Sequence, residues 1–397
     1  MHFLDRYQMT FIFKLLLIFS LFLSAFSYAQ NQDSQSSKLT TTTLSKEQAL
    51  DFFLIEIAIR EKLSVETLRE AFRDMKWQTT ARQYMVPSGS TSARKNWSTY
   101  RANVMNQIRL DAGKKFLQEH HLFLDQLEKE TGVPSSIIVG ILGVETVYGR
   151  NMGSFPVRDV LATFAFDYPK SPNQASRSAM FKEQLYDHVL NCLSKTDQLS
   201  IDLSKLKSCL VQEGSFAGAM GMPQFMPTSI RKFAKDGDGD GVIDLRKSPK
   251  DAMQSIANFL KGHGWKTGEP IYLPISAEMQ NSTVVKELAD GDPNPKYNLG
   301  DLKNKKVITK WPAPMNEVSP ALIVDLPSVS KNGEDSIEYL VGLTNFEVIT
   351  QYNRSFFYAM SVTEFGQAVI NNGFASAKTS KPEKLQSTSN GHRDHKR

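Results

Sequence analysis

Apolar residues recur at helical spacing through the first half of the chain. Leu50, Leu54 and Ile57 show this spacing near the start of the pattern. Because residues three to four positions apart share one face of an α-helix, we predict that residues 46–186 are mainly helical. The same spacing is found, in chain order, at 65–72, 116–127, 248–263 and 355–370.

Residues 267–347 have a different pattern. Short β-branched and apolar runs alternate there with turn-forming residues, which is typical of strands. The sequence therefore predicts a mainly α protein with a small inserted antiparallel β domain at 267–347, between a helical domain at 46–266 and a helical return at 348–374. Residues 192–215 are predicted to be a connecting segment. The predicted strands are, in chain order, 271–275, 307–309, 321–326 and 337–343.

The two ends of the chain differ from this body. A mostly apolar run at 15–26 follows Lys14 and precedes the small residues of Ser27-Tyr28-Ala29, so residues 1–29 are predicted to be a signal peptide for export. The run is shorter than the roughly 20 residues that a membrane-spanning helix needs. We therefore expect no transmembrane anchor in the mature chain. Residues 30–45 read as a flexible linker and 375–397 as a disordered basic tail.

Composition and charge narrow the class of ligand. The chain has 397 residues and 41% hydrophobic content, which allows two or three domains with substantial cores. Its net charge of +5 becomes +4 without residues 1–29. So small an excess does not indicate a nucleic-acid partner, although it is compatible with an anionic polymer. The two cysteines, Cys192 and Cys209, would form a disulfide or remain separate buried thiols after export.

Glu145 is the first candidate for chemistry. Helical spacing places Ile138, Ile141 and Leu142 on the same face as this glutamate. Burial disfavours the charged form of a carboxyl group, so the pKa of Glu145 should be raised, as a general acid requires. The alternative is a structural ion pair with an arginine such as Arg150 or Arg158.

A segment rich in glycine and small residues, 214–227, is the second candidate. Its backbone can approach a ligand closely, while Phe216, Phe225 and Gln224 offer stacking and hydrogen-bonding groups. The segment would otherwise be a tight connection between helices. Together with Glu145 it indicates a groove for an uncharged or weakly charged polymer.

The third candidate is a calcium loop. Asp236, Asp238 and Asp240 occupy positions 1, 3 and 5 of such a loop, and Gly241 follows at position 6. Position 12 is Lys247 instead of glutamate, and the next acid is Asp251. The alternative is a hydrated acidic turn.

These motifs together resemble the membrane-bound lytic transglycosylase B family of peptidoglycan lyases over residues 46–372. The resemblance implies a lysozyme-like core. The motifs that carry it are Gly143-Val144-Glu145-Thr146 with Tyr148-Gly149-Arg150, Gly214-Ser215-Phe216-Ala217-Gly218-Ala219-Met220-Gly221 with Gln224-Phe225-Met226-Pro227, the aspartate loop, His263-Gly264-Trp265, and Tyr352-Asn353-Arg354-Ser355 with Tyr358-Ala359-Met360.

The resemblance also implies roles for individual residues. Glu145 would be the single catalytic residue, and no cofactor would be required for the chemistry. Phe259 stands where the family has a groove tyrosine. The implied substrate-binding residues are Ser215, Gln224, Phe225, Arg177, Tyr352, Asn353 and Tyr358. The implied ligands of a structural Ca²⁺ are Asp236, Asp238, Asp240, the Val242 carbonyl and Asp251.

The implied function is that of a lytic murein transglycosylase. It would cleave the β-1,4 bond between N-acetylmuramic acid and N-acetylglucosamine in peptidoglycan glycan strands without water, leaving 1,6-anhydro ends. The protein would be periplasmic and monomeric. A hydrolytic muramidase is the alternative enzyme and needs a second carboxylate about 5–9 Å away, for which Asp159 and Asp167 are nearest in sequence. A non-catalytic peptidoglycan-binding protein is the alternative outside enzymes.

Overall fold

The computed structural model describes residues 44–86, 95–195, 201–329 and 333–377. The predicted signal peptide, nearly all of the predicted linker and most of the predicted tail lie outside these residues. The chain divides after Ser45, and the following concerns the unit that begins at Lys46. None of the described helices is long and apolar enough to cross a membrane.

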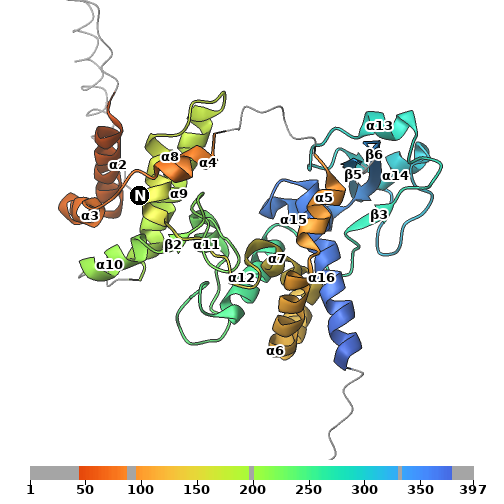
Figure 1. The fold of residues 1–397 in the computed structure, drawn as a ribbon, viewed down its shortest axis with the longest axis horizontal. Helices are drawn as coiled ribbons and strands as arrows, with labels where there is room; N and C mark the ends of the chain where they lie inside the picture. Colours follow the sequence, from red (N-terminus) through yellow and green to blue (C-terminus); the bar gives the residue numbers. More distant parts are fainter. Residues whose placement is uncertain (1–43, 87–94, 196–200, 330–332, 378–397) are drawn as a thin grey trace, which may run out of the picture. The chain divides into compact units, whose positions relative to one another are not determined.

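Helices make up most of this unit (Figure 1), which confirms the mainly α class. Residues 203–210, predicted as connection, form a helix in which Leu206 and Leu210 are buried. The last helix continues into the predicted tail. In chain order the helices are α2 (Lys46–Glu61), α3 (Val65–Phe72), α4 (Thr79–Tyr84), α5 (Trp97–Val104), α6 (Gln107–Thr131), α7 (Ser135–Thr146), α8 (Val157–Phe166), α9 (Gln174–Leu193), α10 (Leu203–Leu210), α11 (Pro227–Phe233), α12 (Pro249–Gly262), α13 (Thr283–Leu288), α14 (Leu299–Asn304), α15 (Thr344–Tyr352) and α16 (Phe356–Ala377).

An antiparallel four-stranded sheet lies in the predicted β region. Its strand order is β3-β6-β5-β4, and β5 and β6 pair from Leu322 with Gly342 to Val329 with Asp335. The predicted strand at 307–309 is wrong, because these residues pair with no strand. Val307 and Ile308 are apolar because they are buried in the core of this region. The strands are β3 (Tyr272–Pro274), β4 (Tyr297–Asn298), β5 (Pro320–Val329) and β6 (Asp335–Gly342), while β1 (Phe155–Pro156) and β2 (Glu213–Gly214) pair separately.

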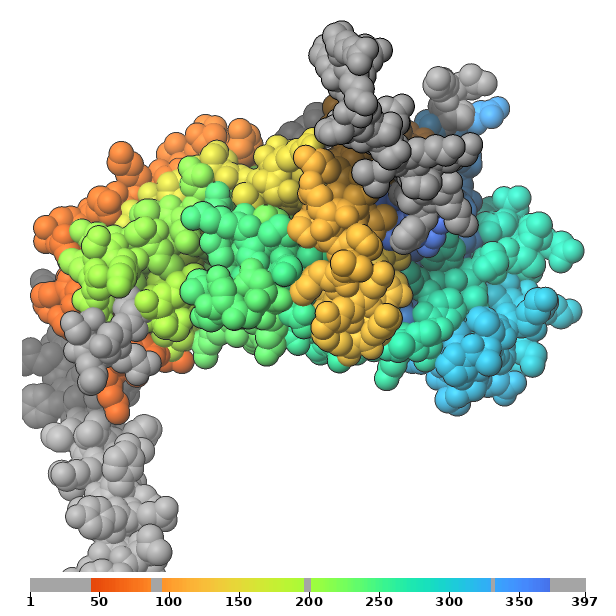
Figure 2. All heavy atoms as spheres, turned by 90° about the horizontal axis from the view of Figure 1, so that it is seen from below, coloured from red at the N-terminus to blue at the C-terminus, as the bar shows by residue number. Residues whose placement is uncertain are grey.

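Three hydrophobic cores hold these elements. The first joins α6, α7, α12, α15 and α16, the second joins α2, α3, α8, α9 and α10, and the third fills the β region. Side chains of β5 alternate between cores: Leu322 and Val324 face the first, whereas Ala321 and Ile323 face the third. In Figure 2 the cyan and light-blue atoms of this region lie together. The sheet therefore separates the third core from the first.

Helices α7 and α16 cross at glycines. A Cβ atom on Gly366 would lie 1.8 Å from the Ser136 carbonyl oxygen, and one on Gly140 would lie 2.3 Å from the Val362 carbonyl oxygen. The backbones approach this closely only because both positions lack a side chain. Figure 1 shows the two helices side by side. The crossing places the end of α7, which carries Glu145, beside the first turns of α16.

A disulfide joins Cys192 of α9 to Cys209 of α10, with Cα atoms 5.5 Å apart. The crosslink closes a loop with a sequence separation of 17. Loops of this size restrict the unfolded chain enough to stabilise a fold by about 3 kcal/mol.

We expect the double variant Cys192→Ala/Cys209→Ala to lower the free energy of unfolding by about 3 kcal/mol. Urea denaturation followed by circular dichroism measures this change. Treating the parent with reductant should lower its midpoint in the same way and leave the variant unchanged. Equal midpoints for parent and variant would contradict the prediction.

Candidate active site

The end of α7 is held in an uncommon backbone conformation. Val147 and Tyr148 have positive φ values of 51° and 57°, which are unfavourable for a β-branched and a bulky residue. The Thr146 hydroxyl compensates by donating to the Met222 carbonyl oxygen at 2.9 Å. This bond ties the turn after Glu145 to the glycine-rich segment 214–227.

Among the described residues, Tyr358 is the hydrogen-bond partner of Glu145. The Tyr358 hydroxyl donates to Glu145 Oε1 at 2.7 Å. Burial raises the pKa of Glu145 to about 7, and the Tyr358 bond acts in the opposite direction because it stabilises the carboxylate. No cation in the described part of the chain forms an ion pair with Glu145. The pKa thus moves in the direction that the apolar helix face predicts.

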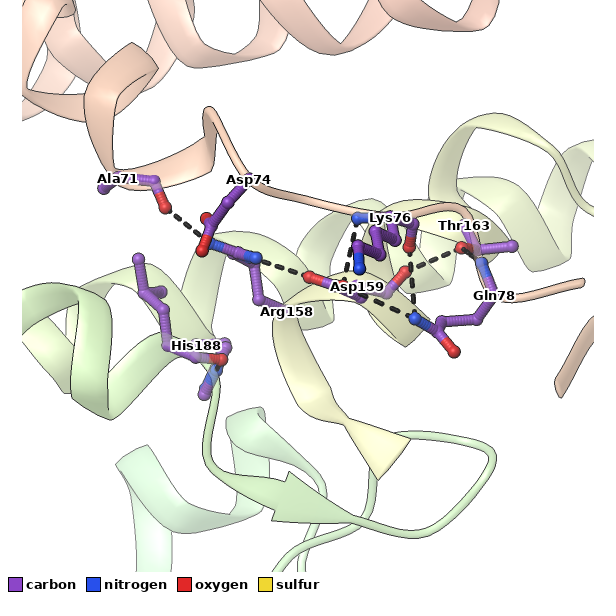
Figure 3. A network of polar contacts seen from close by, with 9 residues as sticks. Ala71, Asp74, Lys76, Gln78, Arg158, Asp159, Thr163 and His188 are labelled. Atoms are coloured by element: carbon purple, nitrogen blue, oxygen red, sulfur yellow. Dashed lines mark hydrogen bonds and ion pairs between the residues drawn. The ribbon is translucent and has the colours of Figure 1, made fainter. Parts of the chain in front are cut away.

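The alternative that Glu145 is held in a structural ion pair with Arg158 is wrong, because Arg158 has other partners. Its Nε donates to Asp159 Oδ1 at 2.8 Å, and its Nη1 donates to Asp74 Oδ1 at 2.8 Å. Figure 3 shows this network, which also holds the Lys76 backbone through Asp159 Oδ2. Arg158 therefore links α8 to the segment after α3.

The two acids considered as a second catalytic carboxylate are also engaged elsewhere. Asp159 is buried and belongs to the Arg158 network (Figure 3). Asp167 pairs with Lys46 Nζ at 3.2 Å and with Arg82 Nε at 3.4 Å. Both acids thus hold the amino-terminal helices onto α8 and the segment that follows it.

Aromatic rings form the wall behind Glu145. Tyr358 stacks on Tyr352 with ring centroids 6.2 Å apart, and Tyr352 packs against Phe225 and Phe259 at 5.7 and 4.9 Å. The Tyr352 hydroxyl donates to the Pro223 carbonyl oxygen at 2.5 Å. Burial, and then the charge of Glu145, raise the pKa of both tyrosines, so both keep their protons. Phe259 is buried in this wall without a hydroxyl.

The glycine-rich segment carries two of the predicted groove residues. Gln224 has a positive φ of 51°, and its amide nitrogen donates to the carbonyl oxygens of Gly221 and Met152 at 2.9 and 3.3 Å. The Ser215 hydroxyl oxygen accepts from the Ala219 backbone at 3.0 Å. Both side chains therefore shape the segment itself.

The structure unites only part of the predicted set. Glu145, Tyr352, Tyr358 and Phe225 are joined by the contacts above, and Gln224 lies on the connected segment. Asn353 is exposed at the end of α15, directly after Tyr352. Arg177 is exposed on α9, and no recorded contact in the described residues joins it to Glu145.

Tyr100 of α5 is a candidate site residue that the sequence prediction missed. Burial, and then the negative charge of Glu145, raise the pKa of Tyr100. Its ring packs on Phe357 and Trp97, with centroids 5.6 and 6.4 Å apart. The pair Trp97 and Tyr100, three positions apart on one helix face, is the available sequence signal.

Three acids of the predicted calcium loop converge. Carboxylate oxygens of Asp236, Asp238 and Asp251 lie within 4.8 Å of one another. Asp251 joins them because it lies in the first turn of α12, where its oxygens accept from the Gly237 and Asp244 backbones at 2.8 and 2.7 Å. Asp240 is not in this group, and its Oδ1 accepts from the Val242 backbone at 2.7 Å. The predicted contribution of the Val242 carbonyl stays a prediction. The three carboxylates suit a hard cation.

A helical core that presents a protonatable carboxyl group beside aromatic rings is typical of lysozyme-like glycan-cleaving enzymes. The sequence profile described as Transglycosylase SLT domain matches residues 45–367. Membrane-bound lytic murein transglycosylase B of Escherichia coli (strain K12) is 35% identical over 315 residues, covering 78% of this chain and 77% of that protein.

Solved structures agree with this match. Soluble lytic transglycosylase SltB1 from Pseudomonas aeruginosa superposes with a TM-score of 0.67 at 34% identity, covering 82% of this chain and 99% of that chain. Escherichia coli lytic transglycosylase Slt35 in complex with calcium has a TM-score of 0.67 at 28% identity, covering 86% and 100%. The chain belongs to the transglycosylase SLT domain family, has the lysozyme-like fold of its lytic transglycosylase relatives, and is an enzyme.

Proposed function

We propose that this enzyme cleaves the bond between N-acetylmuramic acid and N-acetylglucosamine in peptidoglycan and leaves 1,6-anhydro ends, with Glu145 as both general acid and general base. The observation that carries the proposal is a carboxyl group that accepts a hydrogen bond from Tyr358 and whose pKa burial raises to about 7. A single-carboxylate mechanism is also supported by the ion pairs of Asp159 and Asp167, the two acids considered as the second carboxylate of a hydrolase.

The proposed reaction needs one carboxyl group in two protonation states. Protonated Glu145 donates its proton to the glycosidic oxygen while the bond from that oxygen to the muramic anomeric carbon breaks. The resulting carboxylate then accepts the proton of the C6 hydroxyl of the same muramic residue, whose oxygen bonds to the anomeric carbon. No water is consumed, and Glu145 regains its starting proton.

The surroundings of Glu145 support both steps. Burial favours the neutral acid that begins the reaction, while the Tyr358 hydroxyl stabilises the carboxylate that forms. We propose that Tyr352, Phe225 and Tyr100 line the sugar path, because they contact the same aromatic wall or feel the charge of Glu145. Ser215, Gln224, Asn353 and Arg177 remain proposed sugar contacts.

Product analysis tests the reaction. Purified peptidoglycan is digested with the enzyme and the soluble fragments are analysed by mass spectrometry. Anhydro ends support the proposal, because ring closure leaves products 18 Da lighter, about one water, than hydrolysis does. Reducing ends would establish a hydrolase, and an absence of products would refute the proposed reaction.

Tyr358→Phe should change the pH dependence of the reaction. Removing the hydroxyl destabilises the Glu145 carboxylate, so the pKa of Glu145 rises further and the alkaline fall of kcat/KM moves to higher pH. The rate at the optimum should drop by about 10–100-fold, because the carboxyl group loses the bond that orients it. Initial rates between pH 4 and 9 measure both effects.

Tyr352→Phe is the matched control for that experiment. It removes a hydroxyl from the same wall, but this hydroxyl bonds Pro223 instead of Glu145. The alkaline limb should therefore stay at the position of the parent. A Tyr358→Phe profile superimposable on that of Tyr352→Phe would contradict the assigned role.

We also propose that Asp236, Asp238 and Asp251 hold a structural Ca²⁺. Three carboxylates so close repel one another unless a cation neutralises them. The relative Slt35 has been determined in complex with calcium, which supports the choice of this ion. The ion would link the loop to the first turn of α12.

Calcium should then stabilise the protein. At free Ca²⁺ about 100 times the dissociation constant, the free energy of unfolding should rise by about 2.7 kcal/mol. Thermal unfolding with CaCl₂ or EDTA measures the rise. Asp251→Asn should abolish it, whereas Asp244→Asn, in the same loop but outside the cluster, should retain it. A parent that responds equally to CaCl₂ and MgCl₂ would contradict a calcium site.

Export to the periplasm completes the proposal, because its substrate lies there. The signal peptide predicted at 1–29 and the absence of a membrane-spanning helix among the described residues are consistent with it. Amino-terminal sequencing of the protein recovered from the periplasm should begin at Gln30.

A further inference from the structure

A cavity of about 270 Å³ lies beside the segment that leads from Asn353 to Tyr358. One wall comes from residues 354–357, which lead into α16, and the others come from β5, the loop before β4 and Lys95 before α5. The residues that matter for its chemistry are Lys95, Asp325, Arg354, Ser355 and Phe357.

Asp325 is an unusual residue for its position. It follows Ala321 and Ile323 along the face of β5 that packs into the third core. Its Oδ1 is buried and has no hydrogen-bond partner in the described part of the chain. A carboxylate so placed is costly unless a donor satisfies it. Asp325 is also one of the residues that line the cavity.

Two cations stand at the cavity without strong partners. Lys95 is exposed, acts on Asp325 through its charge, and forms no recorded ion pair with a described residue. Arg354 is exposed, and its recorded contact is Asp292 at 3.5 Å. An exposed pair at this distance contributes little. Both cations are therefore available to an anion.

The cavity is connected to the proposed catalytic group. Ser355 Oγ accepts from the backbone of Tyr358, which donates to Glu145. Phe357 packs on Tyr100, whose hydroxyl feels the charge of Glu145. The segment that lines the cavity is therefore continuous with Tyr358, the residue that contacts Glu145.

We propose that this cavity binds the peptide stem attached to the muramic acid residue, with Asp325 accepting a free ammonium group and with Arg354 and Lys95 binding a carboxylate. The inference rests on the proposed function, because a glycan strand beside Glu145 delivers the stem. The volume lies just below the range of about 300–1,000 Å³ for whole small-molecule ligands, so it suits part of a peptide.

The relative SltB3 from Pseudomonas aeruginosa, 25% identical with a TM-score of 0.63, has been determined in complex with NAG-NAM-pentapeptide. A ligand that carries both charges satisfies the cavity better than a neutral sugar, because it supplies the missing donor to Asp325 and an acceptor to the cations. The cavity therefore selects zwitterionic stems.

Three substrates separate this role from a structural one: glycan strands with stems that carry a free amino group, the same strands after acetylation of those amino groups, and strands stripped of peptide. Asp325→Asn should lower kcat/KM about tenfold on the first substrate and leave it unchanged on the other two. Arg354→Gln should lose activity on both peptide-bearing substrates and keep it on stripped strands. Glu338→Gln, an exposed carboxylate on neighbouring β6, is the control and should match the parent throughout.

Equal losses on all three substrates, or no loss on any, would overturn the inference. Asp325→Asn is expected to fold, because it removes a carboxylate that lacks a partner. A second experiment tests the inference without catalysis: the Glu145→Gln protein is titrated with NAG-NAM-pentapeptide that carries a free amino group, and the affinity is measured. The inference fails if the double variant Glu145→Gln/Asp325→Asn binds this probe and its acetylated form with the same affinities as Glu145→Gln does. An absence of anhydro products from the parent would refute only the proposed function.

Discussion

Replacing Glu145 by glutamine should abolish the formation of anhydro products and, at the same time, stabilise the fold above neutral pH. Activity should fall by at least about 10³-fold, because the amide neither donates nor accepts the proton that both steps require. Mass spectrometry of digested peptidoglycan measures the loss. Full activity in this variant would refute the assigned mechanism.

The stability effect follows from the direction of the pKa shift. The pKa of Glu145 is raised from 4.5 to about 7 in the fold, so between these pH values the folded parent binds more protons than the unfolded chain. The stability of the parent therefore falls as pH rises through this window and is level above it. Glutamine has no such dependence.

The free energy of unfolding of Glu145→Gln should consequently equal that of the parent near pH 4 and exceed it by on the order of 1–3 kcal/mol at pH 8. Urea denaturation at both pH values tests this. Glu287→Gln, which removes an exposed carboxylate from α13, should keep the activity and the pH dependence of the parent. A difference in unfolding free energy between Glu145→Gln and the parent that is the same at pH 4 and pH 8 would contradict a raised pKa of Glu145.

Gly366→Ala is expected to be the most destabilising single substitution that we propose, at a cost of at least about 3 kcal/mol. The new Cβ would lie 1.8 Å from the Ser136 carbonyl oxygen and 3.3 Å from Gly140 Cα. These are backbone atoms of α7, so the contact is relieved only if α7 and α16 separate. Glu145 would then move away from Tyr358.

Thermal unfolding and the yield of soluble protein measure this effect, and any folded fraction should show reduced kcat. Gly300→Ala in α14 is the control, because its nearest contacts lie at 3.2 Å and alanine favours helix. A melting temperature for Gly366→Ala within about 2 °C of the parent would show that the crossing tolerates a methyl group.

Local patterns predicted most of the helices, because helical spacing is a property of neighbouring residues. These patterns failed where a short apolar run is buried in a core without pairing in a sheet, because its composition is the same as that of a strand. Val307 and Ile308 have the composition of a strand but fill the third core without pairing, while Tyr297 and Asn298 form the strand. Helix α10 was missed because it is short and lies in a polar stretch.

Local sequence patterns likewise predicted only part of the candidate site. Glu145 and the aspartate loop are visible as motifs, and Tyr352 and Tyr358 entered through the family resemblance. Tyr100 was missed because only the packing of α5 against α16 brings it into the field of Glu145. Asp325 has no motif at all, since its cavity is assembled from the segments around residues 95, 291–293, 325–327 and 354–357.

The sequence by itself determined the helical body, the inserted β region and a glutamate on an apolar helix face, since each depends on residues close together in the chain. Only the tertiary structure decided that this glutamate is held by a tyrosine 213 positions away and pairs with no described cation. Desolvation and hydrogen bonding set a pKa, and both depend on neighbours that folding brings from distant parts of the chain.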